Sequence, residues 1–326
     1  MFKIPVNCRK ILFAVASLAG CLAFCALAVN AAPPLKAGAP ILLPGTNGGF
    51  DFIHVDASAN RLLLDQEKGN QAFDVFDLSS RMLVKRVPTG TTQDVSVDLK
   101  RDLYYVSGND PGRLLIISRK TLDIVGTMPL PTPTNLNAYD PASGMLYETS
   151  DTTPRIWVID PASKKTVATI DLTGTGMQGI VFDPPHKWLY QAVKSAGTVT
   201  AIDPSTNTIS HVWTLDSCAT PHGIAMVPEG NGLLVTCNGS LVLMDRSSGK
   251  ILSRAETAPN VDEVAYDEGL HLAYCASKDG EISVVRVAGE KLTALGSVPD
   301  EKTTHSITVD PKTHTVWIAY AKGDES

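Results

Sequence analysis

The sequence lacks the short motifs that mark common metal, nucleotide and nucleophile sites. It contains no pair of cysteines separated by two residues, no H-E-x-x-H segment, no G-x-S-x-G turn and no phosphate-binding loop. These absences argue against a zinc ribbon, an attached c-type haem, a zincin protease, an α/β-hydrolase and a P-loop nucleotidase. Any chemistry must therefore come from residues that are far apart in the sequence.

Positive charge is also in short supply. The chain has 28 Lys and Arg against 34 Asp and Glu. Removing residues 1–31 takes away Lys3, Arg9 and Lys10, so 25 basic and 34 acidic residues remain, with a net charge of −9. Proteins that bind nucleic acid need a cationic surface to displace counterions from phosphates. The composition argues against nucleic acid as a partner.

Long hydrophobic runs are absent except at the N-terminus. There a basic start, MFKIPVNCRK, precedes ILFAVASLAGCLAFCALAV, with small residues at Ala28 and Ala31. This pattern predicts a secretory signal peptide over residues 1–31, removed on export to the periplasm or the exterior. A lipoprotein anchored at Cys21 is the alternative. No transmembrane segment is expected after cleavage.

What the chain does have is repetition. VDASANRLLL, VDLKRDLYYV, YDPASGMLYE and FDPPHKWLYQ share one pattern with three later segments. The second residue of each copy serves as its anchor, and the anchors are Asp56, Asp98, Asp140, Asp183, Val227, Asp267 and Asp310. Their spacings are 42, 42, 43, 44, 40 and 43 residues. A period of this length indicates one supersecondary unit per copy.

Each copy reads as four short strands. Residues 136–176 divide into LNAYDP, MLYETS, RIWVID and KTVATIDL, separated by turns rich in Pro, Gly, Asp and Ser. Four strands per repeat and the absence of helical periodicity predict an all-β fold, a seven-bladed β-propeller with four-stranded blades. We expect residues 32–326 to form this single domain, as a monomer.

Closure of the ring is the uncertain point of this prediction. The last copy supplies THSITVD and TVWIAYA and then reaches KGDES at Ser326. GAPILLPG, at 38–45, aligns with the fourth strands of the other copies. Two outcomes stay open: an incomplete last blade closed by this N-terminal strand, or a natural chain that continues beyond Ser326.

The repeat resembles the YVTN-repeat β-propellers, an exported bacterial family. RIWVIDPASKKTVATIDL and TAIDPSTNTI carry the resemblance, together with GGFDFIHVD, CATPHGIAM, VTCNG and TVDPKTHTVWI. It covers about residues 40–322. It implies the propeller fold and export, and it implies no particular reaction, because the fold does not fix the function.

Polar residues recur five positions before each anchor. They are Asp51, Gln93, Asn135, Gln178, His222, Asp262 and His305. The positions that follow them are mostly apolar, so we expect the polar residues to surround one mouth of the central channel and to bind a ligand there. Asp94 and Glu263, one residue further on, would add negative charge. No metal site is assigned, although a divalent cation at Asp51 and Asp262 stays open.

Two function classes fit this ring. The first is a binding or interaction module for a protein or small-molecule ligand that the sequence does not identify. The second is a lactonase-like hydrolase that uses the same residues, since seven-bladed lactonases share the architecture. No Arg stands in the ring, which disfavours the second class. We therefore do not expect an enzyme, and no cofactor is predicted.

Cys218 and Cys237 are predicted to form a disulfide. Cys218 lies before the first strand of the fifth copy and Cys237 ends its second strand. Antiparallel strands bring these two points to the same face of the blade, within the roughly 7 Å that a disulfide spans. The resemblance supports the pair through CATPHG and VTCNG. Cys275 would be left as a buried thiol, and three free thiols are the alternative.

Overall fold

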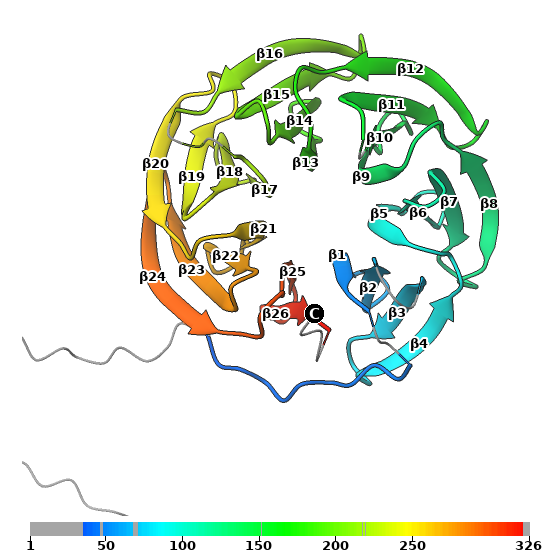
Figure 1. The fold of residues 1–326 in the computed structure, drawn as a ribbon, viewed down its shortest axis with the longest axis horizontal. Helices are drawn as coiled ribbons and strands as arrows, with labels where there is room; N and C mark the ends of the chain where they lie inside the picture. Colours follow the sequence, from blue (N-terminus) through cyan, green and yellow to red (C-terminus); the bar gives the residue numbers. More distant parts are fainter. Residues whose placement is uncertain are drawn as a thin grey trace, which may run out of the picture. The chain divides into compact units, whose positions relative to one another are not determined.

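The computed structural model describes residues 35–45, 48–67, 71–150, 152–216, 218 and 220–321. The predicted signal peptide and Cys21 lie outside these ranges. Every regular element in the described ranges is a β-strand, and none of these residues forms a helix that could cross a membrane. The strands form six four-stranded sheets and one two-stranded sheet, arranged in a ring around a central channel (Figure 1).

Each four-stranded sheet runs outward from the channel in sequence order, with all neighbours antiparallel. The innermost strands are β1 (Phe50–Asp56), β5 (Thr92–Asp98), β9 (Thr134–Tyr139), β13 (Met177–Asp183), β17 (Ile224–Val227), β21 (Val261–Asp267) and β25 (Ser306–Asp310). The second strands are β2 (Arg61–Gln66), β6 (Leu103–Gly108), β10 (Leu146–Ser150), β14 (Trp188–Val193), β18 (Gly232–Cys237), β22 (Leu272–Ser277) and β26 (Thr315–Ala319). The third strands are β3 (Phe73–Asp77), β7 (Arg113–Ser118), β11 (Arg155–Asp160), β15 (Thr198–Asp203), β19 (Ser240–Asp245) and β23 (Glu281–Ala288). The outer strands are β4 (Met82–Val87), β8 (Ile124–Pro129), β12 (Lys165–Asp171), β16 (Thr208–Thr214), β20 (Ile251–Glu256) and β24 (Lys291–Pro299).

The anchor turns explain the repeated Asp. Each anchor ends its innermost strand or directly follows it. Five anchor carboxylates accept a backbone N–H group two or three residues later, as Asp98 does from Lys100 and Arg101 at 3.0 Å; the others are Asp56, Asp140, Asp267 and Asp310. This is the local bond by which Asp favours tight turns. The fourth residue after the anchor adopts a left-handed backbone in six turns: Asn60, Asp102, Gly144, Lys187, His271 and His314.

The hydrophobic core lies between neighbouring sheets. One cluster joins Leu63 and Val75 of the first sheet to Tyr104 and Val106 of the second, all of them fully buried. The alternating apolar residues of the second and third strands therefore pack blade against blade, as the sequence pattern predicts.

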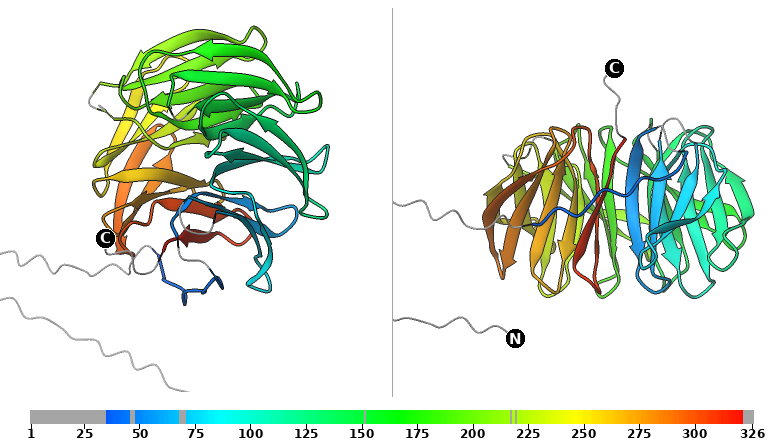
Figure 2. Two further views of the ribbon diagram at one scale, coloured as in Figure 1. Left: turned by 45° about the vertical axis from the view of Figure 1, so that its right-hand side comes forward. Right: turned by 90° about the horizontal axis from the view of Figure 1, so that it is seen from below.

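The ring closes differently from the prediction. The seventh sheet has two strands, and β25 contacts both β1 and β21. Residues 35–45 form no strand but follow the outer side of this sheet (Figures 1 and 2), where Leu35 packs against the core around Tyr274 and Leu43 against that around Phe50. The described residues thus form six four-stranded blades and one two-stranded sheet, and the predicted closure by an N-terminal strand at 38–45 is wrong for them. Pro40 and Pro44 have no N–H to donate to a ladder, which explains the difference.

Candidate functional site

The seven residues predicted to form the polar ring lie at equivalent places. Five of them are the second residue of an innermost strand: Asp51, Gln93, Asn135, Gln178 and Asp262. His222 lies two residues before β17, and His305 directly precedes β25. The structure thus places all seven at or just before the starts of the innermost strands.

His222 and Asp262 form the centre of a polar cluster. His222 Nε2 lies 3.3 Å from Asp262 Oδ1, and Lys278 Nζ forms an ion pair with Asp262 Oδ2. Burial raises the pKa of Asp262, but its interactions with His222 and Lys278 outweigh burial and leave this pKa below its usual value. His305 adds to the lowering. The Asp262 carboxylate is therefore ionised at neutral pH.

The imidazole of His222 is neutral at pH 7. Burial and, to a smaller extent, the charges of Lys194 and Lys278 lower the pKa of His222 to about 4 despite the nearby Asp262. The contact with Asp262 is thus one between a neutral ring and a carboxylate. His222 Nδ1 is buried and has no hydrogen-bond partner among the described residues. A buried nitrogen of this kind has its capacity to donate or accept still available.

The predicted ring residue Asn135 has a structural role. Asn135 Nδ2 donates to the carbonyl of Met177 at 2.7 Å and so ties the third sheet to the fourth. Within the described ranges no hydrogen bond or ion pair joins Gln93, Asn135 or Gln178 to the His222–Asp262 pair. Burial raises the pKa of Asp51 most, and the charges of neighbouring carboxylates, Asp262 among them, raise it further. The contacts of the cluster thus centre on sheets five to seven.

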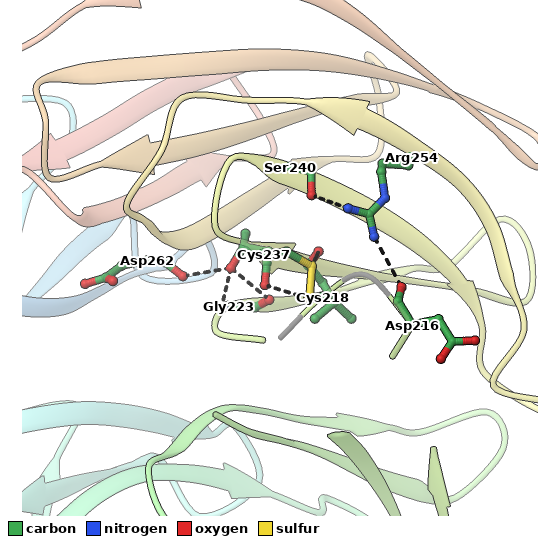
Figure 3. Close-up of a disulfide and its surroundings, with 9 residues drawn as sticks. Asp216, Cys218, Gly223, Cys237, Ser240, Arg254 and Asp262 are labelled. Atoms are coloured by element: carbon green, nitrogen blue, oxygen red, sulfur yellow. Dashed lines mark hydrogen bonds between the residues drawn. A yellow bond between two sulfur atoms is a disulfide. The ribbon is translucent and has the colours of Figure 1, made fainter. Parts of the chain in front are cut away.

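The Cys218–Cys237 disulfide lies close to Gly223, the residue that directly follows His222 in the sequence (Figure 3). The predicted pairing is confirmed, with Cα atoms 5.3 Å apart, and Cys275 is a buried free cysteine. Between the disulfide and the channel, Gly223 N donates to Thr236 Oγ1 at 2.7 Å and to the carbonyl of Asp262 at 2.8 Å. A Cβ atom at Gly223 would lie 2.6 Å from that carbonyl oxygen. Only glycine permits this close approach.

Lys194 and Lys278 are functional candidates that the ring prediction misses. Each directly follows a second strand, β14 or β22, eleven residues after an anchor. Aligning the ends of the second strands as well as the starts of the first would have found them. They supply the positive charge that the predicted ring lacks.

Asp94 and Glu263 connect sheets instead of facing the mouth as free charges. Asp94 Oδ2 accepts from the backbone N–H of Asn137 at 2.8 Å, and Glu263 Oε2 accepts from that of Ile307 at 3.1 Å. Both acids are 4% exposed. Burial, followed by the charge of Asp51, raises the pKa of Glu263 well above its usual range.

The channel beyond the mouth is largely apolar. Its cavity has a volume of about 730 Å³, lined by residues of all seven innermost strands, among them Phe52, Ile180, Val264 and Val309. The channel thus changes from polar at the strand starts to apolar towards the anchor turns, as the alternation in the sequence predicts. In the part of the chain that the structure describes, no group of three or more His, Cys, Asp or Glu side chains could hold a metal ion.

Comparison with known proteins identifies the architecture. No protein-family model matches the chain, and no curated protein matches it. The WD40 repeats of RRP9 superpose with a TM-score of 0.73 at 12% identity, over 86% of this chain and 91% of that chain. A chain of the mitotic checkpoint complex superposes with a TM-score of 0.73 at 13% identity, over 89% of this chain and 95% of that chain. A chain of Kuenenia stuttgartiensis hydrazine synthase superposes with a TM-score of 0.72 at 13% identity, over 87% of this chain and 100% of that chain.

These similarities show the fold alone, because the identities are low. The chain is a β-propeller with four-stranded blades of the kind that WD40 repeats form. The YVTN-repeat resemblance stays a prediction, since no family model supports it.

Proposed function

We propose that this chain is an exported β-propeller that acts as a binding or interaction module and holds its ligand at the channel mouth. The carrying observation is the Asp262 carboxylate, which lies between the neutral ring of His222 and the ammonium of Lys278. The unpartnered His222 Nδ1 leaves this cluster able to bond to a further group.

Several features support export and the propeller type. A disulfide persists in oxidising compartments and is rare in the cytosol, so the Cys218–Cys237 bridge fits a periplasmic or secreted protein. The repeat pattern fits the YVTN type. We regard β25–β26 as the inner half of a seventh blade, since β25 contacts β1 and β21.

The ligand has to be polar on the side that enters the mouth. Lys194 and Lys278 offer ammonium groups, Asp262 offers a carboxylate, and Asp51 offers a carboxyl group whose pKa burial raises well above its usual value. Because both signs of charge are present, a partner with paired donors and acceptors fits better than a simple ion. A loop of a protein partner or a polar small molecule meets this requirement.

Site-specific photo-crosslinking in the producing cells tests the proposal. A photoreactive residue replaces Gln178 at the mouth or, as a control, Val212 on outer strand β16, which is 54% exposed. We expect an adduct from the mouth position alone, and its loss when Asp262→Asn is added. Equal adducts from both positions, or an adduct that Asp262→Asn leaves unchanged, would contradict the proposal. Native mass spectrometry of the protein purified from the producing cells would detect a bound small-molecule ligand.

A lactonase-like hydrolase is the second candidate, favoured by one observation. A neutral histidine beside a carboxylate has the geometry of a general base, although a pKa of about 4 makes His222 a weak one at pH 7. Turnover of a lactone panel that disappears in His222→Gln would establish it. Absence of turnover in a folded, disulfide-bonded sample would remove this candidate and leave the binding module.

A further inference from the structure

A second cavity lies on the face of the ring opposite the channel mouth. It is formed between the anchor turns of the β13–β16 and β17–β20 sheets and has a volume of about 430 Å³. Pockets of this size accommodate small ligands. Its walls include Pro184, Pro185, Met226 and Pro228, and Arg246 also lines it.

Arg246 is a buried cation with incomplete pairing. It is 4% exposed, and its Nε lies 3.2 Å from Asp183 Oδ2. Its Nη2 lies 2.9 Å from His186 Nδ1, which in turn lies 3.0 Å from Asp183 Oδ2. Since one ring nitrogen cannot donate to Asp183 and accept from Arg246 at once, only one of these two contacts forms at a time. Arg246 Nη1 has no hydrogen-bond partner among the described residues.

The same protein contains a completed copy of this arrangement. Arg119 follows β7 as Arg246 follows β19, and it bonds to anchor Asp56 as Arg246 pairs with anchor Asp183. In that copy Arg119 Nη1 also donates to Asp102 Oδ1 at 2.8 Å. Every guanidinium nitrogen of Arg119 therefore has an acceptor.

The equivalent of Asp102 in the fifth sheet is Asn231, four residues after the anchor. Asn231 Nδ2 donates to Asp245 Oδ2 at 2.7 Å and to Ser247 Oγ at 3.0 Å, and among the described residues the Asn231 side chain makes no hydrogen bond to Arg246 Nη1. Asp245 itself stands where the completed copy has Ser118. Two exchanges between repeats have thus removed the second acceptor of the guanidinium and left a cavity beside it.

We infer that this pocket binds a neutral carbonyl group carried on an apolar body. The buried guanidinium lacks an acceptor, while its charge is already balanced by Asp183. The one further acid on the rim, Glu229, is held by Tyr266 and by His271 Nδ1, 2.8 Å away. An incoming carboxylate would add a negative charge beside two existing ones, whereas an amide or ester carbonyl accepts the bond without that repulsion. Proline and methionine walls suit an apolar body.

Saturation-transfer NMR with a matched pair of probes tests this inference on the full chain. Phenylacetamide and phenylacetate have nearly the same shape, but only the first carries a neutral carbonyl. We expect phenylacetamide to bind and phenylacetate to bind at least tenfold more weakly. The double variant Asn231→Asp with Asp245→Ser copies the completed repeat and gives Arg246 its second acceptor. It should weaken phenylacetamide at least tenfold, while thermal unfolding reports that the fold is kept.

A blocked dipeptide, acetyl-prolyl-phenylalanine amide, separates the two sources of such a carbonyl. If the dipeptide binds at least tenfold more tightly than phenylacetamide, the natural ligand is a peptide segment. If it binds equally or more weakly, the natural ligand is a small amide or ester. Three outcomes would overturn the inference: no transfer to either probe from folded protein, phenylacetate binding as well as phenylacetamide, or undiminished binding by the double variant.

Discussion

The carboxylate of Asp94 accepts a hydrogen bond from the backbone N–H of Asn137, 2.8 Å away, across the boundary between the second and third sheets. Its other oxygen accepts from the N–H of Val95 at 2.8 Å and lies 2.6 Å from His54 Nε2. One buried side chain thus joins three groups of the channel wall.

Removal of this carboxylate should destabilise the ring. Asp94→Ala leaves buried donors unpaired, so we expect the free energy of unfolding to fall by about 1–3 kcal/mol per unpaired group. Asp94→Asn keeps one acceptor oxygen and should cost less. Urea denaturation measures both variants. Equal stability of Asp94→Ala and the unmodified protein would show that Asp94 does not hold the sheets together.

The disulfide should contribute about 3 kcal/mol to stability. It closes a loop with a sequence separation of 19 residues, and the chain-entropy model gives this magnitude for such a loop. Cys218→Ser with Cys237→Ser should lower the free energy of unfolding by that amount in urea, whereas Cys275→Ala serves as the single-thiol control.

Burial raises the pKa of Cys275 to about 12, so iodoacetamide should label it only after denaturation. Labelling in the folded state would contradict its burial.

Acid should weaken the fold through His222. Its pKa is lowered from 6.5 to about 4, so the unfolded chain binds the proton more tightly than the folded one. The stabilisation is present above pH 6.5 and is lost as the pH falls towards 4, by about 3 kcal/mol at most. The difference between the unmodified protein and His222→Gln isolates this effect from the buried acids and from His54, whose pKa is raised. A pH-independent difference in urea unfolding would refute the assignment.

Gly223 should tolerate no side chain. A Cβ atom there meets the Asp262 carbonyl oxygen at 2.6 Å, whereas one at Gly230, in the turn between β17 and β18, meets nothing within 4 Å. Gly223→Ala should therefore lower the free energy of unfolding by about 1–3 kcal/mol, because the innermost strands of two sheets must move apart. A lower melting temperature would report this loss. Gly230→Ala is the matched control and should change little. Similar melting of the two variants would contradict the close approach.

The sequence predicts local and periodic features of this protein well. The anchor spacing predicts the sheets, and antiparallel topology predicts the Cys218–Cys237 bridge. Closure is harder, because GAPILLPG has the apolar character of a strand while Pro40 and Pro44 remove its donors. Of the two partners of Asp262, the predicted ring includes His222 and misses Lys278, for another reason. Lys278 lies in a loop, and its place near the mouth can be predicted only when the ends of the second strands are aligned. The unpaired Nη1 of Arg246 cannot be predicted from the pattern, because it depends on the hydrogen-bond partners of the Asn231 side chain.

The two-stranded sheet also determines where the ring can open. A closed ring of sheets loses its stability when one sheet separates from its neighbours, and among the described residues the sheet of β25 and β26 has one ladder where every other sheet has three. The proline-containing segment 35–45 covers it from outside without adding strand pairing. Unfolding should therefore start at this seam, and amide exchange should be fastest in β26 and slowest in the sheets on the far side of the circle. Stability of the whole domain then depends on how firmly one short segment near the N-terminus stays in place.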